Sequence, residues 1–432
     1  MIFRLLVLIV LILALPVLNI KGAENDMDAK DKGGLKIIKT TRYENALFAP
    51  TRPTKPQYAV SPLFTVTDKH SKFMMQIGGF VKPIIGWDIG NVLDDISFIP
   101  AQIPVPAASG NKAGFFLNPM HSSLSFHILG LPGSKHEVGA YVQMMYNAPK
   151  STVQVHHVYV TYAGLLLGRT TTLFADGESM PETIDPQGPN GAVSTHSYQF
   201  SYQHHFRNGI GLGISLELPT FDRYGGKYAD KDYPDLDGKL GYGNASQPIP
   251  DIPLYVEYKG KGKNRIRLSG ILRNFFYYNE MAMATNSRMG WGVQLSGNLQ
   301  PVKPLVLYYQ GTYGKGIGYY IQDLSCLAVS FIPSHDRLGK MQSTPMMGWL
   351  GGFSYRFPSK ITLGGMYSQA RVWKTSVYNP DYKLGQYVAA NLFYPIRDYF
   401  TFGFEYLWGD HEEYADKSAH LNRVQAMLKF NF

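Results

Sequence analysis

The chain has 432 residues, a formal net charge of +9, and 17% charged residues beside 30 Tyr and 44 Gly. The charged fraction lies well below the roughly 25% of an average soluble domain, which disfavours a soluble enzyme. A hydrophobic fraction of 45% excludes a disordered chain. The positive charge favours anionic solutes or anionic lipid over nucleic acid, for which the sequence holds no recognition motif. The alternative is that the protein is basic without having an anionic partner, and this explains the net charge equally well.

Residues 1–23 have the pattern of a secretory signal peptide. Arg4 supplies a positive charge, an apolar run follows from Leu5 to Val17, and cleavage is expected near Ala23. A membrane anchor is the alternative, although the run is shorter than the roughly 20 residues of a spanning helix. The pattern therefore predicts an exported protein.

Residues 24–70 differ in composition from the rest of the chain. They combine Asp and Lys residues with the proline-rich stretch "APTRPTKPQ". We expect a flexible periplasmic segment without a fold of its own. From Phe73 to Phe432 the chain changes to short alternating segments, so residues 71–432 are predicted to form the folded domain.

These segments alternate between apolar and polar residues with a period of two, as in strands with two different faces. In residues 399–408 one face carries Phe400, Phe402, Phe404, Tyr406 and Trp408. In residues 422–432 one face carries Val424, Ala426, Leu428, Phe430 and Phe432. Aromatic-rich apolar faces are typical of a lipid-facing band, and polar faces suit a wet interior. A soluble sandwich is the alternative.

The predicted fold is an all-β, transmembrane, antiparallel β-barrel of about 16 strands in the outer membrane of a Gram-negative cell. Strands are expected near 73–86, 114–129, 136–147, 152–163, 165–174, 195–205, 209–218, 252–259, 264–275, 288–299, 303–313, 346–357, 360–371, 383–394, 398–408 and 421–432. Short links between them are read as periplasmic turns, and long links as extracellular loops. The terminal Phe432 resembles the signal by which the barrel assembly machinery recognises its substrates.

The link after the fifth strand is acidic and rich in proline. Its carboxylates are Asp176, Glu178, Glu182 and Asp185, and it is the third extracellular link by count. A barrel of this size leaves an aqueous channel. We therefore expect this link to fold inward and narrow the channel, as the third loop of trimeric porins does.

The stretch 155–191 resembles the DcaP-like family of trimeric outer-membrane porins. The matching residues are Tyr159-Val160, Gly168-Arg169-Thr170, Pro181-Glu182-Thr183-Ile184-Asp185 and Gly188-Pro189-Asn190, and "FMMQIGGFVKPIIGWD" in the first strand is also similar. The resemblance implies a homotrimer for passive diffusion of small anionic solutes, including dicarboxylates. The family's periplasmic coiled coil is not expected here, because residues 24–70 show no heptads.

Basic residues fall on the predicted inward faces. On strand 264–275 they are Arg265, Arg267 and Arg273, which alternate with apolar residues, and Lys82 lies in the first strand. With Arg169 they are the candidate pore-lining cations, and they should raise the local concentration of anions. The alternative for the arginines is pairing with Glu217 or Glu257.

Two other functions are considered. A barrel enzyme needs a nucleophile with a histidine, but His156 and His157 are expected on opposite faces and no G-x-S-x-G motif occurs. No catalytic residue, metal or cofactor is therefore predicted. A surface receptor or adhesin would use links 219–251 and 314–345.

Overall fold

The computed structural model describes residues 35–48, 62–93, 96–107, 113–147, 152–219, 242–244, 246–325, 327–337 and 339–432. Within these ranges no helix has both the length and the apolar character that a membrane crossing requires. The predicted signal peptide, residues 1–23, lies outside the described residues.

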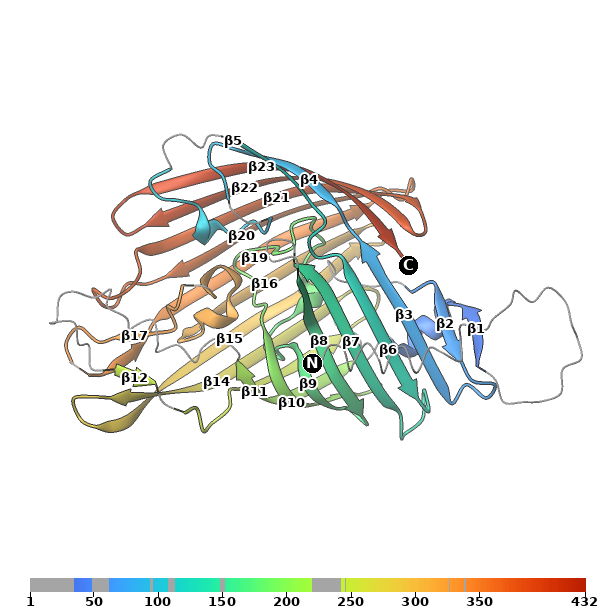
Figure 1. Ribbon diagram of the computed structural model, residues 1–432, viewed down its shortest axis with the longest axis horizontal. Helices are drawn as coiled ribbons and strands as arrows, with labels where there is room; N and C mark the ends of the chain where they lie inside the picture. Colours follow the sequence, from blue (N-terminus) through green and yellow to red (C-terminus); the bar gives the residue numbers. More distant parts are fainter. Residues whose placement is uncertain are drawn as a thin grey trace, which may run out of the picture.

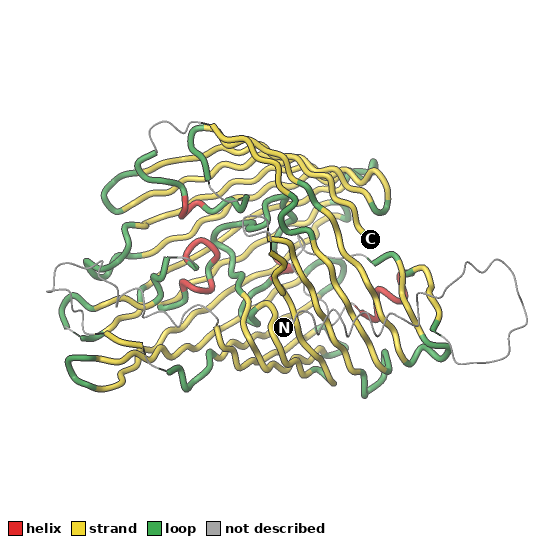
Figure 2. The backbone as a smooth tube through the Cα atoms, in the orientation of Figure 1, coloured by secondary structure: helices red, strands yellow, loops and turns green. Residues whose placement is uncertain are grey.

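Almost all regular structure is β-strand, drawn in Figures 1 and 2. The strands are β1 (Lys36–Lys39), β2 (Phe64–Thr67), β3 (Phe73–Val81), β4 (Ile84–Ile89), β5 (Ala113–Asn118), β6 (Ser123–Gly130), β7 (Val138–Asn147), β8 (Thr152–Tyr162), β9 (Leu165–Thr171), β10 (His196–His205), β11 (Ile210–Pro219), β12 (Tyr242–Asn244), β13 (Ile252–Lys259), β14 (Arg265–Asn279), β15 (Ala284–Val302), β16 (Leu305–Lys315), β17 (Phe331–Pro333), β18 (Met341–Ser343), β19 (Pro345–Arg356), β20 (Thr362–Val372), β21 (Tyr382–Arg397), β22 (Phe400–Glu413) and β23 (Ser418–Asn431). One α-helix, α2 (Arg42–Phe48), and short 3-10 turns complete the described elements.

Antiparallel neighbours follow one another around a closed sixteen-stranded barrel. The first crossing consists of β3 and β4, which are separated at Lys82-Pro83, where proline cannot donate a ladder hydrogen bond. The second crossing likewise consists of β5 and β6. The last strand, β23, pairs with β4, and Phe432 exchanges backbone hydrogen bonds with Gly79 at 2.9 and 3.0 Å. The predicted all-β antiparallel barrel of about 16 strands is confirmed, and each predicted strand range overlaps one observed crossing.

The two faces of the wall differ as the alternation predicts. On β14, Ile266, Leu268 and Leu272 are each about half exposed on the outer face. Arg265 and Ser269, one residue out of phase, are buried on the inner face. Apolar side chains that are exposed in this regular manner are solvated favourably by lipid and unfavourably by water.

Part of the segment 24–70 has regular structure that the sequence analysis did not predict. β2 pairs with β3 over Phe64–Thr67, and β1 pairs with β2, so both strands extend the sheet beside β3 (Figure 1). Phe48 at the end of α2 packs against Met74 and Leu129. Strands of four residues are too short for their alternation to stand out in a sequence.

Candidate functional site

The acidic link after the fifth strand, residues 172–195, is the centre of the candidate site. Its two ends meet where β9 stops and β10 begins, and the Thr172 N–H donates to the Thr195 carbonyl at 2.9 Å. Most of its side chains are buried against the inner face of the wall or against other long links. Below we call residues 172–195 the acidic segment.

The first attachment of the acidic segment to the wall is at Asp176. The Asp176 carboxylate accepts from Arg265 Nη1 at 2.7 and 2.8 Å, and Arg265 also lies 2.8 Å from Glu257 of β13. Ser296 of β15 donates to the same carboxylate. Because every group in this cluster is buried and satisfied, the ion pair holds the segment to β14 and β15.

Leu173 provides a second attachment beside the first. Its N–H donates to Glu217 of β11 at 2.7 Å, and its carbonyl accepts from Arg267. The Arg267 guanidinium also lies over the Tyr255 ring at 3.6 Å. Both wall residues therefore bind the backbone of the segment.

The third attachment, at Asp185, is to β22 near the end of the chain. The N–H groups of Ile184 and Asp185 donate to the two oxygens of Glu405 of β22, at 3.0 and 2.8 Å. The Asp185 carboxylate accepts from the Phe98 N–H at 3.0 Å and from the Tyr387 hydroxyl at 3.1 Å. Burial raises the pKa of the Asp185 carboxyl, against the hydrogen bonds that favour its charged form.

The other two carboxylates of the acidic segment are in different surroundings. The Glu178 side chain is 37% exposed and lies 3.2 Å from Lys259, and Glu182 is exposed. The wall also holds the backbone at these positions: the Glu178 carbonyl accepts from Asn298, and the Glu182 carbonyl from Asn391. Two of the four predicted acidic residues are thus buried anchors, and two face water.

Glycine allows the acidic segment to lie directly against the wall. A Cβ on Gly348 of β19 would come within 2.2 Å of the Gly191 carbonyl oxygen, and a Cβ on Gly191 within 2.2 Å of the Gln369 carbonyl oxygen. The Gly191 N–H donates to Ser368 at 2.8 Å. Any side chain at either glycine would force the two backbones apart.

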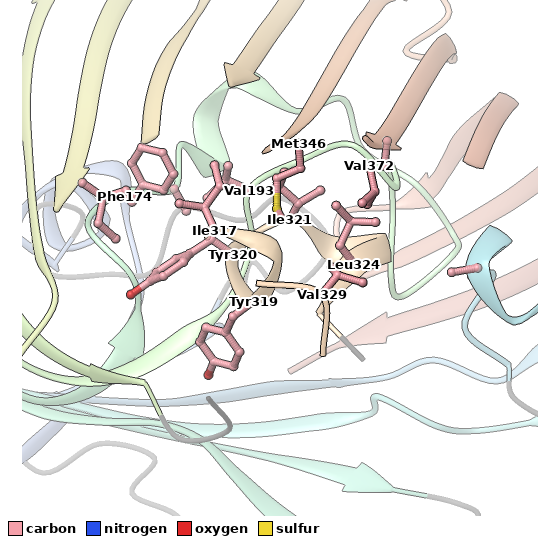
Figure 3. Packing of buried hydrophobic residues seen from close by; sticks show 14 of the residues in the cluster. Phe174, Val193, Ile317, Tyr319, Tyr320, Ile321, Leu324, Val329, Met346 and Val372 are labelled. Carbon is pink, nitrogen blue, oxygen red and sulfur yellow. The ribbon is translucent and has the colours of Figure 1, made fainter. Parts of the chain in front are cut away.

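Two other long links pack against the acidic segment. Figure 3 shows Phe174 and Val193 among Ile317, Tyr320 and other buried side chains of residues 316–344. Asp323 of that link accepts from Asn190, from the Tyr382 hydroxyl and from the Ala101 N–H of residues 96–107. Burial raises the pKa of Asp323. Residues 317–324 are buried, so this part of link 314–345 does not form the surface loop that was predicted; residues 220–241 of link 219–251 lie outside the described residues.

The predicted inward arginines do lie on the inner face, but they have partners there. Arg265 pairs with Glu257, which agrees with the pairing alternative. Arg273 lies 2.9 Å from Asp251 and donates to the Gly316 carbonyl. Each of these two guanidinium charges is therefore offset by a carboxylate at contact distance.

Lys82 lies on the inner face next to another cation. Phe430 is paired with Val81, which places Lys429 beside Lys82 at the junction of β23 and the first crossing. Lys82 Nζ donates to the Ile184 carbonyl at 3.3 Å, and Lys429 Nζ lies 4.4 Å from the centre of the Phe80 ring. Two lysines thus meet the acidic segment near its exposed Glu182.

The predicted inward position of Arg169 is wrong. Arg169 is paired with Val158 and Tyr198, which are exposed on the outer face of the wall. Its guanidinium donates to the carbonyls of Val155 and His156. The leucine run before Arg169 does not alternate, so the sequence alone did not fix which face this residue occupies.

An ion pair between the first and last crossings was missed. Arg423 of β23 contacts Asp88 of β4, donates to the Ile96 carbonyl, and is fully buried. The sequence does contain a signal for this ion pair. A closed barrel must pair its first and last strands, and these two strands carry opposite charges on their polar faces.

No known family profile and no curated protein matches the sequence. Solved structures do match. The outer membrane channel DcaP of Acinetobacter baumannii is 18% identical, with a TM-score of 0.69 over 85% of this chain and 99% of that one. An anion-selective porin from Comamonas acidovorans is 10% identical, with a TM-score of 0.51 over 83% and 100%. A loop-deletion mutant of OmpT, an outer membrane protein of Vibrio cholerae, is 9% identical, with a TM-score of 0.51 over 84% and 100%.

The chain forms a closed barrel with an apolar outer face, and its fold is similar to those of the solved structures above. These features define it as an outer-membrane β-barrel with the porin fold. Within that class its fold is that of the DcaP channel, so the resemblance seen in residues 155–191 is confirmed at the level of the fold.

Proposed function

We propose that the protein is an outer-membrane porin for passive diffusion of small, preferentially anionic solutes, including dicarboxylates. The observation that carries this proposal is a closed barrel with a polar inner face, to which the acidic segment is bonded at several strands. A barrel of this size encloses an aqueous channel, through which solutes can diffuse without a conformational change of the protein. The proposed protein needs no cofactor and catalyses no reaction.

In this proposal the acidic segment narrows the channel. Hydrogen bonds attach the segment to β11 at Leu173, to β14 at Asp176 and to β22 at Asp185. The segment is therefore attached to strands that are far apart in the barrel wall. Deleting residues 178–189 should then raise the single-channel conductance while heat-modifiable electrophoretic mobility, the mark of a folded barrel, is kept.

The proposed anion preference rests on lysines more than on arginines. Arg265 and Arg273 have carboxylates at contact distance, so little of their charge acts on a passing solute. Lys82 and Lys429 are buried side by side against a carbonyl and a ring face, and two like charges at one place add to the positive potential there. The exposed Glu178, which lies beside Lys259 and away from the two lysines, would supply the negative side of a transverse field.

Reversal potential in a planar bilayer under a salt gradient tests the preference. We expect the wild-type protein to favour chloride, and Lys82→Gln to shift the potential towards the cation value, most at low salt. Each charge in a wet pore is worth about 1 kcal/mol or less. Arg169→Gln is the matched control, because it removes one cation from the outer face. A wild-type preference for cations would contradict the proposal.

The assembly is also proposed. The resemblance to DcaP-like porins supports a homotrimer, whose mass in detergent can be measured by light scattering. Export would use residues 1–23, and insertion among outer-membrane lipids would use the barrel assembly machinery acting on Phe432. Phe432 pairs with Gly79, so it lies where the last strand closes the barrel. The assembly machinery would bind Phe432 only after the whole chain has been made.

A further inference from the structure

Three histidines converge at the base of the acidic segment. His156 and His157 belong to β8, and His196 is the first residue of β10. Their ring centres are 4.7 Å (156–157), 4.1 Å (156–196) and 4.9 Å (157–196) apart, with steep angles between the ring planes. One nitrogen from each ring can be chosen so that all three lie within 4.8 Å of one another.

A β-bulge produces this arrangement. Gln143 of β7 is paired with His157, and the next residue, Met144, is paired with Val155, so His156 is an extra residue in β8. Strict alternation had placed His156 and His157 on opposite faces, where they could not act together. The bulge overturns that prediction, because it brings the two rings together with their centres 4.7 Å apart.

We propose that His156, His157 and His196 form a binding site for one transition-metal ion of the Zn²⁺ type. Three imidazoles are a common ligand set for Zn²⁺, and they bind Mg²⁺ and Ca²⁺ poorly because those ions prefer oxygen. Zn–N bonds of about 2.1 Å require nitrogens about 3.4 Å apart in a tetrahedral site. Rotation of the His156 and His196 rings about their χ angles would close the remaining distance.

The surroundings of His157 suit a metal ligand. Its Nδ1 lies 2.8 Å from the Thr170 hydroxyl of β9, and both residues are buried. With the proton on Nδ1, this bond fixes the ring and leaves the Nε2 lone pair for the metal. Metal-bound histidines generally have such a partner on their second nitrogen.

Charge near the site determines what else binds there. The three ligands are neutral, and Arg169 Nη1 donates to the His156 carbonyl at 2.6 Å. A second cation so close weakens metal binding, and it also favours an anion over water at the fourth position. The site would therefore hold its metal less tightly than a structural site with thiolate ligands.

A bound metal would connect β8 to β10 across the last residues of β9. That is the place where the acidic segment leaves the wall and returns, closed by the Thr172–Thr195 hydrogen bond. The ion would act as a cross-link that fixes the base of the segment. Zn²⁺ should then raise the temperature at which heat-modifiable mobility is lost.

Equilibrium dialysis of the full-length, tag-free protein in detergent against Zn²⁺ tests the proposal. We expect one tight site per chain and at least tenfold weaker binding in His196→Gln. His204→Gln is the matched control, since His204 lies in the same strand, is exposed, and should bind as wild type does. Ca²⁺ at the same concentration should not compete.

Two results would overturn the proposal. One is a folded His196→Gln variant that binds Zn²⁺ as tightly as wild type. If that variant does not fold, Thr170→Val decides, because loss of the partner of His157 should lower metal affinity about 10- to 100-fold. Unchanged affinity in that variant is the second refuting result. Co²⁺ in place of Zn²⁺ gives an independent readout, since histidine ligation produces a visible absorption band that Thr170→Val should shift or weaken.

Discussion

Replacing Asp176 by Asn should loosen the acidic segment from β14 without unfolding the barrel. The carboxylate accepts from Arg265 at 2.7 and 2.8 Å, and both side chains are buried. Removing one partner of a buried ion pair costs about 3–5 kcal/mol when the other charge is left alone. Arg265 keeps Glu257 at 2.8 Å, so the loss falls to about 2 kcal/mol, the range of a hydrogen bond to a charged group.

A loss of about 2 kcal/mol changes the ratio of attached to detached segment by roughly 30-fold. Single-channel recording measures this as more frequent, larger excursions of the current above the main level. Glu178→Gln is the matched control, because Glu178 is 37% exposed and 3.8 Å from Arg265, and pairs of this kind contribute about 0.5 kcal/mol.

Equal current noise in Asp176→Asn, Glu178→Gln and wild type would refute the reasoning. It would mean that the attachments at Leu173 and Asp185 hold the segment by themselves, or that the segment does not limit the current. Limited proteolysis separates the two, since a detached segment would be cleaved faster in Asp176→Asn whatever its effect on conductance.

Three further predictions follow from other contacts. Gly348→Val should push Gly191 off the wall and change the conductance of a barrel that still folds, as judged by heat-modifiable mobility. Because burial raises the pKa of Asp185, its contribution to attachment is fully present below the ordinary carboxyl pKa and is lost as pH rises through the raised value. Current noise should therefore fall as the pH is lowered through the raised pKa of Asp185, and Asp185→Asn should remove its share of that dependence. Arg423→Gln should leave Asp88 buried without its partner and lower the unfolding free energy by about 3–5 kcal/mol, measured by denaturant unfolding in detergent.

The barrel itself could be predicted from the sequence because most crossings alternate between apolar and polar residues. Lipid on one side and a wet interior on the other force a period of two, so Phe400, Phe402 and Phe404 locate a strand and its faces together. The same rule fails where the sequence does not alternate. Arg169 follows a run of leucines, and its face is decided only by pairing with Val158 and Tyr198.

The details of the site depend on contacts between residues far apart in the chain. Asp176 and Glu178 are two residues apart and chemically alike, yet one is a buried anchor and the other is in water. Arg265 and Ser296 contact the Asp176 carboxylate directly, whereas Glu178 pairs with Lys259 at the solvent. The bulge at His156 is a local exception to pairing, and the sequence contains no Gly or Pro there that would indicate it.

The seam between the first and last crossings bears on how the chain folds. Arg423 and Asp88 are 335 positions apart, and they meet only when β23 reaches β4. Contacts of such high sequence separation are slow to form, so closure is expected to be the last step of folding. Until then β4 and β23 are both open strand edges that can pair with another chain. A ribosome that stops before β23 therefore releases a chain that cannot complete its ring, and cells making this protein should depend on chaperones that shield the two edges during export.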